Sequence, residues 1–346
     1  MRILSVGNLT NYGQSNTCLH RHWSLESIGE VDSVDTAIDN VSLNYKVRNW
    51  LFQRGLSVSL PDIAGVNNDI MAKVKSHKYD VVWIDKGTLV NYRTLEFIKK
   101  TSPKTKIISY SPDNMALRHN QSQNYLHSLP YYDYVFTNKS YIIDTLHKLG
   151  AKNVQFVNNS YESQFHYPRV LSPEDVKKYD VDVGFIGTWE KERFQSILYL
   201  AENGINVTVF GDGKWNSFKN HHFNLNIKPP LYSEEYCKAL KGFKISLCFL
   251  RKMNLDQQTT RSVEIPACGG FMLAERTEEH CKLFKEGNEA DFFETNEELL
   301  KKCRYYLIND ELRVEIARAG TERCIASGYS NNMTIKRMIE IALKNS

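Results

Sequence analysis

An arginine and a glutamate near residue 260 carry the pattern with the most chemical content in this sequence. Arg261 and Glu264 stand three positions apart within the segment DQQTTRSVEIPACGGFMLAE, which runs from residue 256 to residue 275. On a short helix, residues at that spacing lie on one face. A carboxylate can accept hydrogen bonds from both hydroxyls of a ribose, and a guanidinium can bridge phosphate oxygens. The pair therefore predicts a nucleotide-binding site, with an internal ion pair that holds the helix as the alternative.

A turn that contains glycine, in the segment GFIGTWEKER at residues 184–193, is a second candidate contact for phosphate. The expected strand ends at Gly187 and Thr188, and a helix begins a few residues later. The free backbone N–H groups of such a turn and helix start suit a diphosphate, and Arg193 can add a charge-assisted contact. Glycine that serves only a tight turn is the alternative.

Another glycine turn follows the next expected strand of the same half. Gly211 and Gly213 flank Asp212 after Phe210, and glycines let a backbone approach a base and ribose closely. Tyr232, or a backbone amide near it, could meet the base. An ordinary surface loop explains these residues equally well.

The first half offers two candidates for a catalytic base. Asp113 follows Ser111-Pro112 at the end of an expected strand, and His119 lies shortly beyond it. Either side chain could accept the proton of an attacking hydroxyl. Asp113 as a simple turn residue after proline is an equal alternative. The loop from Asn8 to Thr17, with small polar residues at another strand end, is expected to line the acceptor side.

These residues must be positioned by an alternation of strands and helices. In the first half we expect strands at 3–6, 80–85, 106–110, 134–137 and 154–157, and helices at 43–54, 92–100 and 140–149. The first of these helices carries Leu43, Val47, Trp50 and Leu51 on one apolar face. The stretch 158–179 has little periodicity and predicts a connection between two domains.

A second alternation begins after that connection. Strands are expected at 181–187, 205–210, 243–250 and 271–274, with helices at 193–201, 233–240 and 259–267 and a helical tail from residue 297. Alternation of this kind predicts an α/β fold with parallel sheets, with ligands at the carboxyl ends of the strands. We therefore expect two open α/β domains with a ligand cleft between them.

Composition excludes several classes of protein. The 346 residues are 42% hydrophobic and 24% charged, which suits two folded domains, and the net charge of +4 is spread too evenly to predict nucleic-acid binding. It is compatible with nucleotide phosphates or with peripheral contact at an anionic membrane surface. Seven cysteines without a CxxC pair indicate reduced thiols. The start reads as a strand rather than a signal peptide, and no apolar run is long enough to span a membrane, so a cytoplasmic location is expected.

Familiar catalytic motifs are absent. The sequence contains no GxxxxGK[ST], no GxSxG and no HExxH, and the turns after the expected strands fail GxGxxG. Asp180 and Asp182 match a metal-binding DxD pattern, but they precede their strand, so a solvated strand entry is the better interpretation. No metal site is predicted.

The motifs of the second half, in their order, resemble the CgeB-type, group 1-like glycosyltransferases of bacteria. The resemblance rests on FIGT with Glu192-Arg193, then VFGDG at 209–213, RSVEIPACGGF at 261–271 and FKEGNE at 284–289. It covers about 181–329, and the first half is similar more loosely through YDVVW, SPD and YDYVFT. With this resemblance, a role in cell-surface polysaccharide biosynthesis is expected.

That resemblance implies the GT-B architecture, in which two Rossmann-like domains face each other across a cleft. It implies an acceptor-binding domain at 1–165, a nucleotide-sugar-binding domain at 166–329, and a last helix at 330–346 that packs back on the first domain. It also implies transfer without a metal or other cofactor. Related retaining enzymes carry two glutamates separated by seven residues; Glu264 fits the second, while Asp256 stands at the first.

The predicted function is transfer of a glycosyl group from a nucleoside diphosphate sugar, with UDP-sugars favoured, to a hydroxyl of a glycan or lipid-linked acceptor. The predicted donor site comprises Gly187, Thr188, Arg193, Gly211, Gly213, Tyr232, Arg261 and Glu264, and the catalytic candidates are Asp113, His119 and Asp256. Retention is favoured and inversion stays open, as do the sugar and the oligomeric state. A nucleotide-sugar epimerase and a non-catalytic nucleotide-sugar-binding module are the alternatives.

Overall fold

The protein forms two compact units in a computed structural model that describes residues 1–11, 13–38 and 41–344. Unit 1 comprises Met1–Asn158 together with Asn331–Ser346, and unit 2 comprises Asn159–Ser330. The sequence had suggested a division after residue 165 and a last segment from residue 330. Within the described residues, no helix is both long and apolar enough to cross a membrane.

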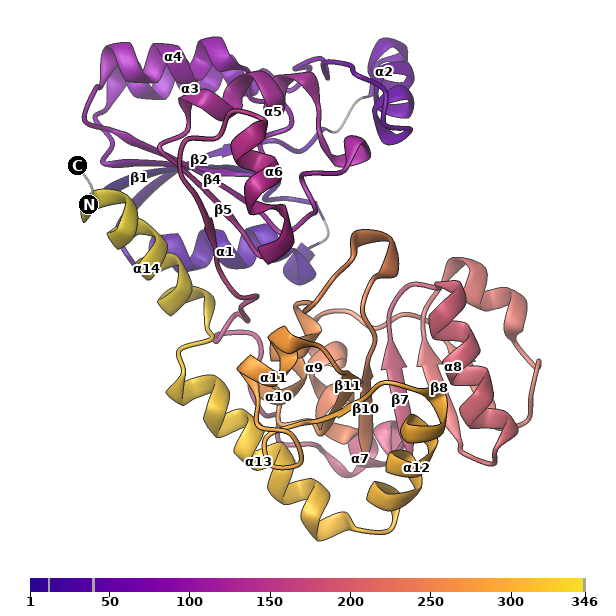
Figure 1. Ribbon diagram of the computed structural model, residues 1–346. Helices are drawn as coiled ribbons and strands as arrows, with labels where there is room; N and C mark the ends of the chain where they lie inside the picture. Colours follow the sequence, from indigo (N-terminus) through magenta and orange to yellow (C-terminus); the bar gives the residue numbers. More distant parts are fainter. Residues whose placement is uncertain (12, 39–40, 345–346) are drawn as a thin grey trace. The chain divides into compact units, whose positions relative to one another are not determined.

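Unit 1 is built on a six-stranded parallel sheet with helices on both faces (Figure 1). The strands, in the spatial order β2-β1-β3-β4-β5-β6, are β1 Arg2–Gly7, β2 Glu30–Asp35, β3 Val81–Asp85, β4 Lys106–Ser111, β5 Tyr134–Thr137 and β6 Val154–Phe156. The order reverses direction between β1 and β3, and open α/β sheets bind ligands outside the carboxyl ends of the strands at such a point.

Alternating strand residues supply the two cores of unit 1. Leu4, Val82 and Ile107 face one core, which is covered by α3 Val66–Ser76, α4 Tyr92–Thr101, α5 Gln123–Ser128 and α6 Ile143–Lys148. Their neighbours Ile3 and Trp83 face the other core, which is covered by α1 Thr17–Glu26 and α14 Asn331–Lys344. The last helix therefore packs on the first unit, as the resemblance implied.

The helix α2 Leu43–Gln53 forms where periodicity predicted a helix, at 43–54. On its apolar face Leu43, Val47 and Trp50 are exposed, and only Phe52 of the helix is buried. The periodicity predicts a helix of this kind but does not tell what covers its apolar face. Short 3-10 turns complete this unit: η1 Gly13–Ser15, η2 Arg118–Asn120, η3 Leu129–Tyr131 and η4 Ser140–Ile142.

Unit 2 repeats the plan with a second six-stranded parallel sheet, in the order β12-β11-β10-β7-β8-β9. Its strands are β7 Val183–Ile186, β8 Val207–Phe210, β9 Leu225–Lys228, β10 Ile245–Cys248, β11 Met272–Glu275 and β12 Asp291–Phe293. Here the order reverses between β7 and β10.

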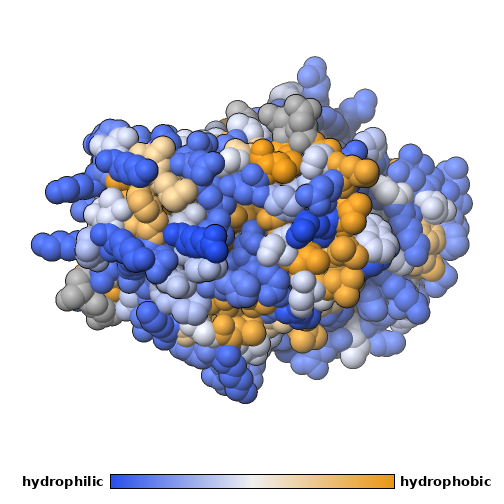
Figure 2. Space-filling model, turned by 90° about the horizontal axis from the view of Figure 1, so that it is seen from above, coloured by the Kyte–Doolittle hydropathy of each residue, from blue (hydrophilic) through white to orange (hydrophobic). Residues whose placement is uncertain are grey.

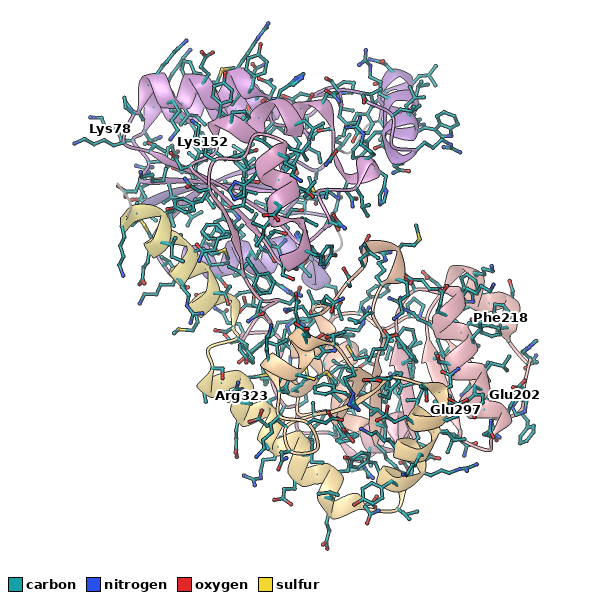
Figure 3. All side chains as sticks on the ribbon, viewed as in Figure 1. Lys78, Lys152, Glu202, Phe218, Glu297 and Arg323 are labelled. Atoms are coloured by element: carbon teal, nitrogen blue, oxygen red, sulfur yellow. The ribbon has the colours of Figure 1, made fainter. Side chains whose placement is uncertain are left out.

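Helices cover both faces of the second sheet. They are α7 Pro173–Tyr179, α8 Lys191–Glu202, α9 Ser233–Gly242, α10 Arg261–Ala267, α11 Glu278–Leu283, α12 Asn296–Leu307 and α13 Asp310–Ala326, with the 3-10 turns η5 Gly213–Phe218 and η6 Lys252–Asn254. Residues of α8, α12 and α13 pack with Val183 and Phe185 in the core of this unit. In Figure 3, Arg323 of α13 is labelled; its Nε donates a hydrogen bond of 3.0 Å to the carbonyl of Leu283 at the end of α11.

The predicted connection at 158–179 is folded rather than irregular beyond residue 172. Ser172 and Asp175 form a capping box at the start of α7, with Pro173 in the first turn, so the helix begins where its first N–H groups find partners. Asp182 and Asp180 lie 2.7 and 3.7 Å from the Nζ of Lys244. This pairing agrees with the interpretation of the DxD residues as a strand entry.

Candidate functional site

The carboxyl ends of β7 and β10 form the candidate binding site of unit 2, because the strand order reverses between them. Gly187 and Thr188 follow β7 directly, and Leu250 and Arg251 follow β10 after one further residue. The predicted donor residues Gly187 and Thr188 therefore lie at this edge of the sheet.

The turn after β7 is closed by its own hydrogen bonds. The N–H of Gly187 donates to the carbonyl of Phe210 at 3.1 Å, and its carbonyl accepts from Nε1 of Trp215 at 2.9 Å. The Gly187 N–H is therefore not free for a diphosphate, which corrects one part of the prediction. A Cβ at Gly211 would lie 2.5 Å from the Trp215 ring and 2.7 Å from the Gly187 carbonyl oxygen, so Gly211 is required for this close turn.

Arg193, in the first turn of α8, is buried beside this turn. Its Nη1 donates to the carbonyl of Thr188 at 3.2 Å, and its Nη2 lies 3.5 Å from Glu190. Burial lowers the pKa of Arg193 below its ordinary value; Glu190 opposes this, while the positive charges of Arg261 and Arg251 add to it. An anion bound here would offset both the cost of burying the positive charge and the repulsion between the guanidinium groups.

Arg261 opens α10 and reaches the same turn. A Cβ placed on Gly187 would lie 3.4 Å from a terminal nitrogen of Arg261. Its Nε is buried and has no hydrogen-bond partner among the described residues. Because buried donors in proteins are normally paired, this group is available for a ligand oxygen.

A buried histidine, His280, fixes the N-terminal end of α10. His280 Nε2 lies 2.7 Å from Ser262 Oγ, and its Nδ1 lies 2.7 Å from the carbonyl of Glu275. Ser262 Oγ in turn accepts from the N–H of Thr259 at 3.0 Å. These bonds set the direction of the helix that carries Arg261.

Glu264, one turn along α10, is held by two groups that the sequence did not suggest. Its carboxylate accepts a hydrogen bond from the Tyr236 hydroxyl at 2.6 Å and lies 3.6 Å from His166 Nε2. Burial lowers the pKa of His166 more than the nearby carboxylates raise it, so the imidazole is neutral at pH 7. Arg261 and Glu264 form no ion pair with each other in the described structure, which removes the predicted alternative of an internal Arg–Glu pair.

The remaining donor candidates are Tyr232 and Gly213. Tyr232 is 60% exposed just before α9, whereas Tyr236, one turn later, is the tyrosine that binds Glu264. Gly213 has a φ of +57° and open space around it, so its backbone conformation explains the glycine. Phe218, labelled in Figure 3, stacks on Trp189 at 6.2 Å between ring centroids and so ties η5 to the entry of α8.

Asp256 lies in the loop between η6 and α10. Its N–H donates to the carbonyl of Arg251 at 3.3 Å, and its side chain is half-buried. The carboxylate is thus on the segment that joins β10 to the helix of Arg261 and Glu264.

Unit 1 contains a polar cavity of about 690 Å³ at its own reversal point, beyond the carboxyl ends of β1 and β3. Asn8, Asn16 and Thr17 line it, so the loop that we expected on the acceptor side does border a cavity. Asp113 lines it as well, whereas His119 lies in η2 and is not among its described lining residues.

Charged pairs line this cavity. Arg21 donates to both carboxylate oxygens of Asp85, at 2.6 and 3.0 Å, and both side chains are buried. Burial disfavours the charged guanidinium, but Asp85 outweighs it and raises the pKa of Arg21. Lys86 Nζ lies 2.6 Å from Asp113. This ion pair holds the Asp113 carboxylate at the cavity wall.

Sequence reasoning missed Tyr236, His166, Arg21 and Lys86. His166 comes from the segment interpreted as a connection between domains, and Arg21 lies in α1, a helix that was not predicted, so no periodicity pointed to them. Tyr236 is one turn beyond Tyr232 on a helix that was predicted, and its position over Glu264 could have been weighed there. Among the described residues, no group of three or more His, Cys, Asp or Glu could hold a metal ion.

Comparison with known proteins adds a family match for part of the chain. Residues 191–340 match the family model described as glycosyl transferase-like, which includes α8, α10 and the predicted donor residues between them. None of the curated proteins matches the chain significantly.

Solved structures resemble the whole chain at low sequence identity. HepE from Anabaena, in complex with UDP-glucose, is 15% identical with a TM-score of 0.64, and each chain covers 100% of the other. Sucrose-phosphate synthase from Thermosynechococcus elongatus is 11% identical with a TM-score of 0.66 and the same coverage. A candidate UDP-N-acetylglucosamine 2-epimerase from Listeria monocytogenes is 12% identical with a TM-score of 0.58, covering 98% of this chain and 94% of that one.

At these identities the likeness shows the fold. The CgeB-type resemblance, which is narrower than the family match, stays a prediction. The chain has the GT-B architecture of two Rossmann-like units, and its residues 191–340 match the glycosyl transferase-like family.

Proposed function

We propose that the protein transfers a glycosyl group from a nucleoside diphosphate sugar to a hydroxyl of a glycan or lipid-linked acceptor. The observation that carries this proposal is the convergence of Arg193 and Arg261 at the end of β7, where both are short of counter-charge. A diphosphate would supply that charge. The end of β7 also lies at a reversal of the strand order, where α/β sheets bind nucleotides.

The rest of the donor would extend from the diphosphate along α10. Glu264 is positioned by Tyr236 with one helical turn between it and Arg261, a spacing that suits ribose hydroxyls next to a phosphate. HepE binds UDP-glucose on the same architecture, which favours a UDP-sugar as the donor. The first turn of α8 has no side-chain cap, so its N–H groups can assist Arg193.

In the proposed reaction, the bond between the sugar C1 and the diphosphate oxygen breaks, and its electron pair stays on the diphosphate. The acceptor oxygen bonds to C1, and its proton leaves. In a retaining reaction the departing phosphate takes that proton; in an inverting one a carboxylate takes it, and Asp113 at the unit 1 cavity is the candidate. Arg193 and Arg261 stabilise the charge that develops on the leaving group, so the proposal requires no metal.

An activity assay distinguishes this proposal from its rivals. The protein is incubated with a panel of UDP-sugars, with and without glycan and lipid-linked acceptors, and free UDP and the sugar nucleotide are both measured. Transfer predicts UDP release that depends on acceptor and survives EDTA. Epimerised UDP-sugar without acceptor would support the epimerase and overturn the proposal, and binding without any turnover would support a non-catalytic module.

A further inference from the structure

The helix α2 presents two different faces. Tyr45 and Phe52 pack toward the core of unit 1, and Asn49 and Gln53 line the polar cavity together with them. The opposite side, turned to solvent, carries Leu43, which is 77% exposed, with Val47 and Trp50 at successive turns. A polar outer face is the rule for a helix on a globular protein, so this outward stripe requires a partner.

Two further exposed apolar residues follow the helix in the chain. Leu56, half exposed, follows its end, and Ile63 is exposed farther along the same segment. Figure 2, which looks down on unit 1 from above, shows hydrophobic residues gathered on its right-hand side, where α2 lies in Figure 1. We call Leu43, Val47 and Trp50 the outer stripe of α2.

The segment that carries the outer stripe is rich in positive charge. Residues 41–63 contain Lys46, Arg48 and Arg54, and none of them forms an ion pair in the part of the chain that the structure describes. The guanidinium of Arg54 lies 3.7 Å from the centre of the Trp50 ring. The one acid of this segment, Asp62, is occupied by the N–H groups of Val66 and Asn67 at the start of α3.

We propose that the outer stripe of α2 binds the surface of an anionic lipid bilayer. Leucine, valine and tryptophan on one side of a helix, with flanking lysine and arginine, match the apolar boundary and the negative headgroups of such a surface. A second protein copy would meet the same uncompensated positive charge on its own α2, which disfavours self-association through this face.

The proposal does not depend on glycosyl transfer, because it concerns a surface rather than a reaction. If the proposed function also holds, the inner face of α2 places the cavity of unit 1 close to the headgroups. The acceptor would then be a lipid-linked molecule whose polar end reaches that cavity.

Vesicle binding tests the proposal on the full chain. Co-sedimentation is measured with vesicles of phosphatidylcholine alone and with vesicles that also contain phosphatidylglycerol. The expected result is binding to the anionic vesicles only, weakened by added salt. Replacing Lys46, Arg48 and Arg54 by glutamine should weaken it roughly 100-fold, because each basic residue near an anionic surface is worth about a fivefold factor.

The apolar part is tested by replacing Leu43, Val47 and Trp50 with serine. These side chains are exposed, so thermal unfolding should be unchanged while binding to anionic vesicles is lost. The fluorescence of Trp50 adds a direct readout: anionic vesicles should shift the emission of the protein to shorter wavelength, and Trp50→Phe should remove that shift.

A matched control replaces three exposed apolar residues of unit 2, Val170, Phe223 and Ile308, with serine. This variant should bind vesicles like the unaltered protein. Failure of the unaltered protein to bind anionic vesicles would overturn the proposal, as would binding that the α2 variants retain. A dimer in sedimentation that the serine variant converts to a monomer, without vesicle binding, would assign the stripe to a second copy instead.

Discussion

At the scale of single residues, two guanidinium groups meet at the carboxyl end of β7, with Arg193 buried and Arg261 half-buried. Arg193 has Glu190 at 3.5 Å, and Arg261 has a buried Nε without a partner among the described residues. Positive charge that is removed from water and incompletely neutralised costs free energy until an anion binds. The turn between the two groups is closed by Gly187, Gly211 and Trp215, so the guanidinium groups rather than the Gly187 amide are the contacts available to phosphate.

Glu264 gives a prediction at this scale. Glu264→Gln keeps the side-chain shape and the hydrogen bond from Tyr236 but loses one acceptor oxygen and the charge, so UDP should bind about tenfold more weakly in titration calorimetry. Tyr236→Phe leaves the carboxylate in place and is the matched control, with affinity changed far less. Equal losses in the two variants would mean that Glu264 supports the helix rather than the nucleotide.

At the scale of elements, α10 connects the buried histidine His280 to the ligand residues. The imidazole is neutral, because burial lowers its pKa below the ordinary 6.5 despite the hydrogen bond to the Glu275 carbonyl. In the unfolded chain His280 takes up a proton as the pH falls below about 6.5, and in the folded chain it does so only at a lower pH. The folded state is therefore stabilised above that pH and loses this stabilisation below it.

The corresponding measurement is urea unfolding between pH 7.5 and pH 5, within the range set by the ordinary histidine pKa of about 6.5. The free energy of unfolding should decrease as the pH falls through this window, and His280→Asn should make the decrease smaller. The slope should not vanish, because burial lowers the pKa of His166 and His22 as well. A His280→Asn variant with an unchanged slope would show that this imidazole takes up a proton in the folded protein.

Individual strands and helices show which parts of the fold the sequence could predict and which it could not. Apolar strand runs such as 81–84 and 245–248 predicted the two parallel sheets, because both faces of these strands are buried. The edge strand β2, with the sequence EVDSVD, was missed because solvent on its edge permits charged residues. The apolar periodicity of α2 predicted a helix, but it did not predict what covers the apolar face of that helix.

The site residues divide in the same way. Arg193, Arg261 and Glu264 were predicted because their types and spacing suit a nucleotide, and their contact with a nucleotide stays a prediction. Tyr236 and His166 were not, because they reach Glu264 only through the packing of α9 and of the segment before α7, and that packing has no local sequence signal. Whether Tyr232, Asp256 and Asp113 contact ligands stays a prediction.

At the scale of the whole molecule, the chain leaves unit 1 at Asn158 and returns to it at Asn331. The returning helix α14 buries Ile335, Met338 and Ile339 against Trp83 and Phe136 of the first sheet. Unit 1 thus depends on residues that are made last, after the whole of unit 2.

This dependence predicts a separation of stability from nucleotide binding. Ile339→Ala leaves a cavity in the core of unit 1 and should lower its free energy of unfolding by about 2–5 kcal/mol, measured by urea titration. UDP affinity should stay unchanged, because the proposed nucleotide residues belong to unit 2. A large loss of UDP affinity in the folded variant would mean that nucleotide binding requires an intact unit 1.

The most direct test of the central claim is calorimetric titration of Arg261→Gln with UDP and, separately, with uridine. If Arg261 binds the diphosphate, UDP affinity should decrease about 10- to 100-fold, the usual value of a hydrogen bond to a charged group, while uridine affinity should not change. Undiminished UDP affinity in this variant would contradict the assignment of the β7 strand end as the diphosphate site.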